Sequence, residues 1–192
     1  MHGVDSCLVR ETLGAAVELH GCDLQPHPYE VFFAFSGLDY TPLRHPFELP
    51  YPDEAFDTVI GSGVLEHVPH PAESLLEVAR VLRPGGRFVI TFLPNRVSYT
   101  EIARTLLGQD HHDRRYTRRQ IAAQLRDSGL EPLVSGYHQV VPTLAGPVEG
   151  RLGWLASLRR GVEHLYAANH LLEQVWPVNR VAANLFVVAQ KR

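Results

Sequence analysis

The residues from Leu49 to Ile90 constrain the fold of this chain more than any other stretch. Asp57–Ile60 is a short apolar run that ends in Gly-Ser-Gly, which is typical of a buried strand running into a loop. Pro71–Leu82 has apolar residues at helical spacing and begins with a proline suited to a first helical turn. After a Pro-Gly-Gly segment, Phe88–Phe92 is again strand-like. Two strands joined by a helix form a βαβ unit, so we expect parallel strands and a right-handed crossover.

The residues of this stretch also resemble those of a known family. The chain reads LPYPDEAFDTVIGSGVLEHV from Leu49 to Val68 and EVARVLRPGGRFVITF from Glu77 to Phe92. This closely resembles the middle of class I S-adenosylmethionine-dependent methyltransferases, in the small-molecule group with the ubiquinone/menaquinone type of motif. The resemblance is tight over residues 48–93 and loose over most of the chain. It implies a three-layer, Rossmann-like α/β fold with a mostly parallel sheet and an antiparallel last strand.

Length and composition favour one ordinary globular domain. With 192 residues, of which 45% are hydrophobic and 20% charged, the chain suits a single domain over residues 1–192. The formal net charge of −3 argues against a nucleic acid as the main partner. The sequence has no long apolar run and no signal peptide pattern, and Cys7 and Cys22 lack metal-type spacing. We therefore expect no membrane span, reduced cysteines and a cytoplasmic protein.

The first 24 residues predict a helix and then a strand that ends in a carboxylate. Val4–Leu13 suits a short helix, and Ala15–Cys22 suits a strand that leads to Asp23 and Leu24. A carboxylate at the end of the second strand of a nucleotide-binding α/β fold accepts hydrogen bonds from ribose hydroxyls. The resemblance therefore implies that Asp23, with Leu24 beside it, binds the ribose of S-adenosylmethionine. The alternative is a solvated aspartate in a turn.

The same resemblance implies that the first strand of the family is missing from this sequence. In the family that strand leads into a glycine-rich loop that holds the cofactor, and here Gly3 would be the last trace of the loop. Three explanations stay open: the sequence starts late, a short homologue completes its site in another way, or the protein has kept the fold and lost methyl transfer. The missing strand and glycine-rich loop bear directly on whether S-adenosylmethionine binds.

The aromatic run Val31–Phe35 precedes a second pair of predicted cofactor residues. The family usually has a strand here that ends in an acidic residue beside the adenine, which implies roles for Asp39 and Tyr40. The competing interpretation makes Val31–Phe35 a core strand or a surface for a partner.

Two histidines are the predicted catalytic residues. The residues Gly61, Ser62 and Gly63 come at the carboxyl end of a strand, where open α/β sheets bind ligands, so we predict that they contact the cofactor. His67 follows them and has a side chain that can take a proton from an acceptor near neutral pH. The alternative is that Leu65–Val68 only caps the next helix.

The segment Gly108–Tyr116 resembles a loop over the acceptor pocket of the family. His112 in it is the other predicted catalytic residue, and His111, Arg115 and Tyr116 are candidate acceptor contacts. Adjacent histidines without further ligands at a recognised spacing do not predict a metal site. Four arginines, Arg114, Arg115, Arg118 and Arg119, suit an acidic or phosphorylated acceptor or simply a solvated helix start.

The remaining chain predicts the outer part of the sheet. Thr117 and Gln120 form a capping box at the start of a helix that Gly129 ends. Leu133–Val141 and Ala183–Gln190 read as the last two strands, with a helical insertion at about residues 146–178 between them. The insertion suits a lid or a surface that binds a partner chain.

Two functions from different classes follow. The first is transfer of a methyl group from S-adenosylmethionine to a small-molecule acceptor. The second is a methyltransferase-like protein without methyl transfer, either a cyclase-type metabolic enzyme or a non-catalytic subunit in a homo- or hetero-oligomer. The absent glycine-rich loop is the feature that separates them, because only the first requires the methyl donor to bind.

Overall fold

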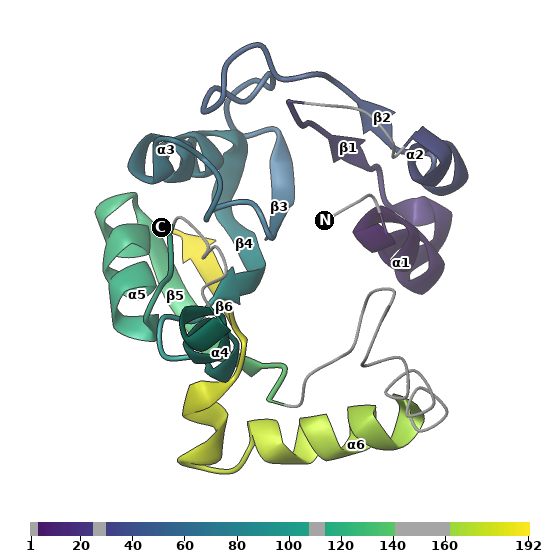
Figure 1. Ribbon diagram of the computed structural model, residues 1–192. Helices are drawn as coiled ribbons and strands as arrows, with labels where there is room; N and C mark the ends of the chain where they lie inside the picture. The colour runs from purple at the N-terminus through teal and green to yellow at the C-terminus, as the bar shows by residue number, and fades with distance from the viewer. Residues whose placement is uncertain (1–3, 25–29, 108–113, 141–161) are drawn as a thin grey trace.

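The computed structural model describes residues 4–24, 30–107, 114–140 and 162–192 (Figure 1). Strands and helices alternate through most of this range. The elements are α1 (Val4–Leu13), η1 (Gly14–Ala16), β1 (His20–Gly21), α2 (Glu30–Ser36), β2 (Asp39–Tyr40), β3 (Phe56–Ser62), α3 (Pro71–Val81), β4 (Leu82–Pro94), α4 (Tyr99–Leu107), α5 (Arg118–Asp127), β5 (Leu130–His138), α6 (Val162–Glu173), η3 (Val178–Val181) and β6 (Asn184–Lys191).

The main sheet has four strands in the order β3-β4-β6-β5. β3 and β4 are parallel, as the βαβ pattern predicts, and β6 is antiparallel to both β4 and β5. β3, β4 and β5 therefore run in the same direction, and their carboxyl ends lie at one edge of the sheet. This confirms the predicted antiparallel last strand.

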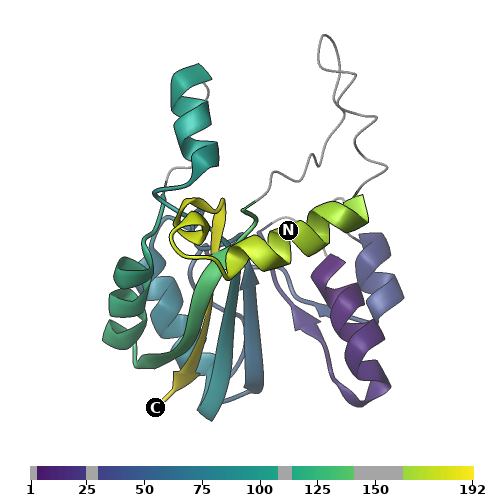
Figure 2. The ribbon, with the colours of Figure 1, turned by 90° about the horizontal axis from the view of Figure 1, so that it is seen from below.

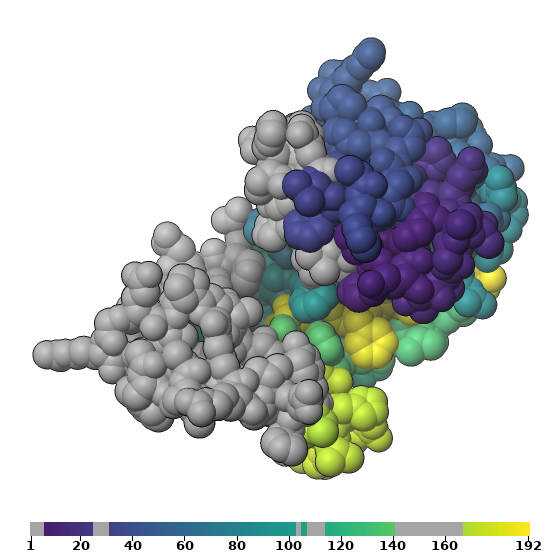
Figure 3. All heavy atoms as spheres, turned by 90° about the vertical axis from the view of Figure 1, so that its right-hand side faces the viewer, coloured from purple at the N-terminus to yellow at the C-terminus, as the bar shows by residue number. Residues whose placement is uncertain are grey.

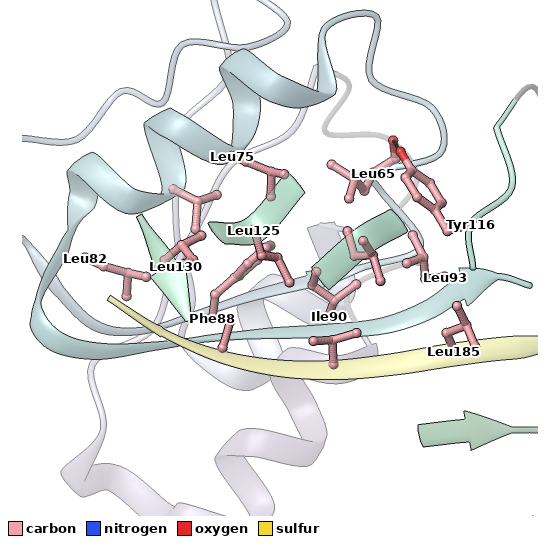
Figure 4. Close-up of a cluster of buried hydrophobic side chains, with 14 residues drawn as sticks. Leu65, Leu75, Leu82, Phe88, Ile90, Leu93, Tyr116, Leu125, Leu130 and Leu185 are labelled. Carbon is pink, nitrogen blue, oxygen red and sulfur yellow. Dashed lines mark hydrogen bonds between the residues drawn. The ribbon is translucent and has the colours of Figure 1, made fainter. Parts of the chain in front are cut away.

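Helices on both sides of the sheet give the predicted three layers (Figures 1 and 2). α3 and α5 cover one face, and α1 and α2 lie on the other side. The core fills the space beneath α3 and α5, where Leu75, Leu125, Phe88 and Ile90 point toward one another (Figure 4). Their burial follows from the helical spacing of the leucines and from alternation along β4.

The opposite face of the main sheet is less covered. Figure 3 shows yellow atoms of β6 and green atoms of β5 between the N-terminal residues and α6. Ile60 and Val134 on this face are 46% and 55% exposed. They lie in one row across the sheet, because Ile60 pairs with Val89, Val89 with Val188, and Val188 with Val134.

β1 and β2 form a separate two-stranded parallel sheet. No strand in the described part of the chain pairs with β3 on its open side. Rings span the break instead: the His20 ring lies 5.6 Å from the Phe56 ring and 6.2 Å from the Tyr51 ring, centroid to centroid. The sheet is therefore interrupted between β1 and β3, at the place where the resemblance implies a missing strand.

Arg80 of α3 holds the segment that leads into β3. Its guanidinium donates to the carbonyl oxygens of Leu49 and Tyr51 at 3.0 and 2.8 Å. It also bonds Asp53 at 2.8 Å and both carboxylate oxygens of Glu77 at 2.8 Å. These hydrogen bonds with Arg80 lower the pKa of Glu77. One side chain thus fixes the entry to β3 against the crossover helix.

The N-terminal strands were predicted only in part. α1 has the predicted bounds, and Gly14 ends it in the left-handed region with φ of +70°. The predicted strand Ala15–Cys22 is wrong over most of its length, because Gly14–Ala16 is a 3₁₀ helix and only His20–Gly21 pairs as a strand.

The aromatic run Val31–Phe35 is helical and not a core strand. It belongs to α2, where Val31 and Phe35 are 75% and 66% exposed. The strand in this region is instead Asp39–Tyr40. The apolar composition misled the prediction because a short apolar run fits a strand and a helix equally well.

The second half of the chain follows its predicted pattern closely. The capping box of Thr117 and Gln120 is present at the start of α5, and β5 begins and ends three residues before the predicted strand Leu133–Val141. The insertion contains α6 and η3, and its residues 146–161 lie outside the described part. Glu173 fixes α6 to the end of β5 by accepting from the Gln139 amide at 2.8 Å and pairing with His138 at 2.9 Å. Within the described residues, no helix has both the length and the apolar character needed to cross a membrane.

Replacement of Leu125 by alanine tests the core. Leu125 is 0% exposed, so Leu125→Ala should lower the free energy of unfolding by about 2–5 kcal/mol through lost burial and a residual cavity. Leu106→Ala is the matched control, since Leu106 is 81% exposed and its loss should change stability by less than about 0.5 kcal/mol. Urea unfolding measures both, and equal losses would contradict the assignment of the core.

The reactivity of the Cys22 thiol tests whether the contact between the two sheets is closed. Burial, opposed by a hydrogen bond with Tyr51 and reinforced by the charge of Asp23, raises the pKa of the Cys22 thiol to about 11. Because the thiolate is the nucleophile, alkylation of folded Cys22 by iodoacetamide should be slow at pH 8 and should rise about tenfold per pH unit below that pKa. In urea, Cys22 should react as an ordinary cysteine of pKa about 8.5. Peptide mass spectrometry measures both rates, and equal rates at pH 8 would show that the site is open.

Candidate functional site

The loop that follows β3 is the centre of the candidate site. The Gly63 amide donates to the Thr91 carbonyl oxygen at 3.0 Å, and the Thr91 hydroxyl donates to Ser62 Oγ at 2.8 Å. Gly63 has φ of +60°, which favours glycine. A Cβ atom on Gly61 would lie 3.2 Å from the Phe88 ring. The end of β3 is therefore a fixed stretch of backbone with little side-chain bulk.

A buried carboxylate lies beside this backbone. Glu66 is 4% exposed, and its Oε2 atom has no hydrogen-bond partner among the residues that the structure describes. Its Oε1 atom lies 3.8 Å from His67 Nε2. The His67 side chain is 62% exposed, so one residue of the pair faces inward and the other faces solvent. A buried acceptor without a partner is a frequent property of functional sites.

Two residues of the following segment hold the loop in place. The Tyr116 hydroxyl donates to the Leu65 carbonyl oxygen at 3.3 Å, and burial raises the pKa of Tyr116. The Arg114 guanidinium donates to the carbonyl oxygens of Val68 and Pro69. Both were predicted to meet an acceptor, whereas the structure shows them bonded to the loop that carries Glu66 and His67.

Asp23 and Leu24 lie just after β1. The Leu24 amide donates to Asp23 Oδ1 at 2.6 Å, and the Tyr40 hydroxyl donates to the Asp23 carbonyl oxygen at 2.9 Å. Asp23 is exposed, so its carboxylate is able to accept further hydrogen bonds.

Asp39 and Tyr40 form β2 itself and do not follow a longer strand. Asp39 Oδ2 lies 3.4 Å from His20 Nδ1, and the Asp39 side chain is largely exposed. The Tyr40 ring stacks on Phe33 with a centroid separation of 5.0 Å, and burial raises the Tyr40 pKa. Asp39 and Tyr40 thus line the second strand of the small sheet, next to Asp23.

The predicted site residues fall into two groups in the structure. Asp23, Leu24, Asp39 and Tyr40 are together on the two-stranded sheet, and the glycines with His67 are at the carboxyl edge of the four-stranded sheet. The break between β1 and β3 separates the groups. Gly3 and His112, like His111, lie outside the described residues, so their roles stay predictions.

Sequence reasoning gave too little weight to Glu66 and did not identify Thr91. The signal for Glu66 was an acidic residue directly after an apolar loop, but its burial depends on long-range contacts with Tyr116 and Arg114. No local sequence pattern marked Thr91 as a site residue, because its role comes from the pairing of β4 with β3. No group of three or more metal-ligating side chains comes together in the described part of the chain.

Glu66→Gln tests whether the buried carboxylate is held for function. A neutral amide is cheaper to bury than an unpaired charge, so the free energy of unfolding at pH 8 should rise by about 1 kcal/mol. Glu73→Gln is the matched control, because Glu73 lies at the same 3.8 Å from a histidine, His70, but is 54% exposed, and its replacement should have no measurable effect. A loss of stability in Glu66→Gln would mean that the carboxylate has a structural role.

Comparisons with known proteins agree with this fold. Residues 6–90 match the family model described as a methyltransferase domain. The demethylmenaquinone methyltransferase of Streptomyces griseus is 38% identical over 81 residues, which cover 39% of this chain and 31% of that protein. The 27-O-demethylrifamycin SV methyltransferase of Amycolatopsis mediterranei is 49% identical over 95 residues, which cover 44% of this chain and 33% of that protein. The matched part therefore spans about a third of each relative.

A solved structure has the same fold over nearly the whole chain. The methyltransferase solved in complex with the Trm112 methyltransferase activator of Haloferax volcanii superposes with a TM-score of 0.65 at 18% identity, covering 98% of this chain and 77% of that one. The similarity extends to the break and the outer strands, beyond the matched residues 6–90. Residues 6–90 therefore match a methyltransferase domain and resemble S-adenosylmethionine-dependent methyltransferases, and nearly the whole chain shares the fold of a solved methyltransferase.

Proposed function

We propose that this protein transfers the methyl group of S-adenosylmethionine to a small-molecule acceptor. The observation that supports this most is the loop after β3, where a stretch of glycine backbone and the unpartnered Oε2 atom of Glu66 lie together. This loop is at the carboxyl edge of a parallel βαβ unit, which is where open α/β sheets bind ligands.

The residues present fit part of the cofactor. Asp23 offers an exposed carboxylate that accepts hydrogen bonds from hydroxyl groups, as a ribose requires, and Asp39 offers an exposed carboxylate for the adenine. A Cβ atom on Gly61 would meet the Phe88 ring, so glycine keeps the backbone at the end of β3 free of a side chain, and Tyr40 offers a ring face beside Asp23. When bound, S-adenosylmethionine supplies an activated methyl group, so the protein needs mainly to place an acceptor in line with it.

The acceptor side of the proposed site includes His67. Its exposed ring lies next to the buried Glu66 carboxylate, with His67 Nε2 3.8 Å from Glu66 Oε1. A proton released by an acceptor hydroxyl or amine passes to this ring in the proposed reaction. His112, which lies outside the described residues, keeps its predicted catalytic role.

Small organic molecules are the proposed acceptor class. The relatives are named for demethylmenaquinone and for 27-O-demethylrifamycin SV, both small molecules, and this chain shares their matched residues. The net charge of −3 also disfavours a polyanionic acceptor.

A methyltransferase-like protein without methyl transfer is the second candidate. The observation that favours it is the break in the sheet, because no described residue forms a glycine-rich loop between β1 and β3. Such a protein would act as a cyclase-type enzyme or as a subunit that pairs with another chain. The two candidates differ in whether the methyl donor binds.

Calorimetry with S-adenosylmethionine and S-adenosylhomocysteine tests the proposal. We expect each ligand to bind at one saturable site. S-adenosylhomocysteine should remain chemically unchanged during the titration. A sample that unfolds cooperatively and binds neither ligand would overturn methyl transfer and support the second candidate.

Asp39→Asn tests the proposed contact with the adenine. Loss of a hydrogen bond to a charged acceptor should weaken S-adenosylhomocysteine binding about tenfold or more. Asp127→Asn is the control, since Asp127 is exposed near the end of α5 and removes the same charge. Isothermal titration measures both dissociation constants, and equal affinities would show that Asp39 does not contact the cofactor.

A further inference from the structure

A second cavity lies at the same edge of the sheet but at the far strand. It has a volume of about 550 Å³ and is formed by the start of α5, the end of β5 and η3. β5 is three strand positions from β3 in the sheet, so the cavity is roughly 14 Å or more from Gly63. It is therefore separate from the proposed methyl-transfer site, and its ligand goes beyond that function.

Three arginines give the cavity its charge. Arg118, Arg119 and Arg180 line it, and none of them has a carboxylate partner in the described part of the chain. They gather in a protein whose formal net charge is −3. The amino end of the ten-residue helix α5 lies at the same place and adds a positive potential. The cavity therefore favours an anion.

Two aromatic side chains give the cavity flat apolar surfaces. The Arg118 guanidinium carbon lies 5.4 Å from the centre of the Tyr137 ring. Trp176 also lines the cavity and is 74% exposed. Rings of this kind stack on planar groups, so they favour an anion that carries a ring over a bare ion.

One polar atom in the cavity wall has no partner. Asn179 Nδ2 donates to the Glu173 carbonyl oxygen at 3.1 Å, which fixes the orientation of the amide. Its Oδ1 atom is buried and has no hydrogen-bond partner among the described residues. Because this oxygen is inaccessible, the Asn179 amide supports the wall of the cavity and is not a ligand contact.

The walls of the cavity are held from several elements. The Arg118 Nε atom donates to Ser135 Oγ at 3.0 Å, which fixes this arginine against β5. Asn95 Nδ2 donates to the carbonyl oxygens of Arg180 and Ala182 at 2.9 Å each, which fixes η3 against the end of β4. The cavity is therefore built before any ligand binds.

We propose that this cavity binds a small organic anion, a phosphate or a carboxylate carried on a planar ring. Its volume is in the range of small-molecule sites, and the three arginines and the two rings each match one part of such a ligand. A nucleic acid would need an extended basic surface, which a chain of net charge −3 does not favour.

Titration calorimetry with phenyl phosphate, benzoate and inorganic phosphate tests the proposal without the methyl donor. We expect one saturable site for phenyl phosphate or benzoate, with at least tenfold weaker binding of inorganic phosphate, and whichever ring-bearing probe binds more tightly identifies the anion. S-adenosylhomocysteine should leave these affinities unchanged, so the result does not depend on the methyl-transfer proposal.

A double variant of two exposed arginines in the cavity wall tests the proposed anion binding most directly. Arg119→Gln with Arg180→Gln should weaken binding of the ring-bearing probe tenfold or more. Arg44→Gln with Arg87→Gln is the matched control, because it removes the same charge from two exposed arginines away from the cavity, and it should bind as the parent protein does. Trp176→Ala should reduce the advantage of the ring-bearing probe over inorganic phosphate.

Several results would overturn the proposal. These are no saturable binding of any probe to a folded sample, equal loss of affinity in the control pair, or tighter binding of a short single-stranded RNA than of phenyl phosphate at the same salt concentration.

Discussion

The hydrogen bonds of Arg80 are the interaction on which the arrangement of the two sheets depends. Arg80 joins α3 to the carbonyl oxygens of Leu49 and Tyr51, so the segment before β3 has one position relative to the crossover helix. That position places the Tyr51 ring against Phe56, with centroids 4.8 Å apart, and next to His20. Burial raises the pKa of Tyr51, and the adjacent Cys22 thiol raises it further, which is consistent with a closed contact between the sheets. Side chains thus take over the connection that strand pairing would otherwise make.

The carboxyl edge of the main sheet carries both of the sites that we infer. At β3 a glycine backbone lies beside a buried carboxylate, and at β5 three arginines lie beside two rings. Each contains a buried polar oxygen without a partner in the described residues, on Glu66 and on Asn179. Such atoms cost stability, because a buried acceptor without a hydrogen bond has lost its contact with water. Asn95, which follows β4, links the two regions because it bonds the carbonyl oxygens of η3.

The elements that local sequence controls were predicted well. α1 ends at Gly14 with φ of +70°, and the capping box of Thr117 and Gln120 starts α5, because caps and left-handed glycines act over three or four residues. Errors arose where local signals are ambiguous. The aromatic run of α2 was open to a strand interpretation, and only His20–Gly21 of the predicted strand Ala15–Cys22 pairs with another strand.

The sequence by itself determined the βαβ unit, the family that it resembles and the chemical types at the ends of the strands, since these follow from periodicity, turn residues and motif order. The tertiary structure alone decided which of these residues meet. It separated Asp23 and Asp39 from Gly61–Gly63 by a break in the sheet, buried Glu66 beside His67, and brought Arg118, Tyr137 and Asn179 to one cavity. The physical reason is that strand pairing and burial join residues tens of positions apart, and no local pattern encodes the partner across such a distance.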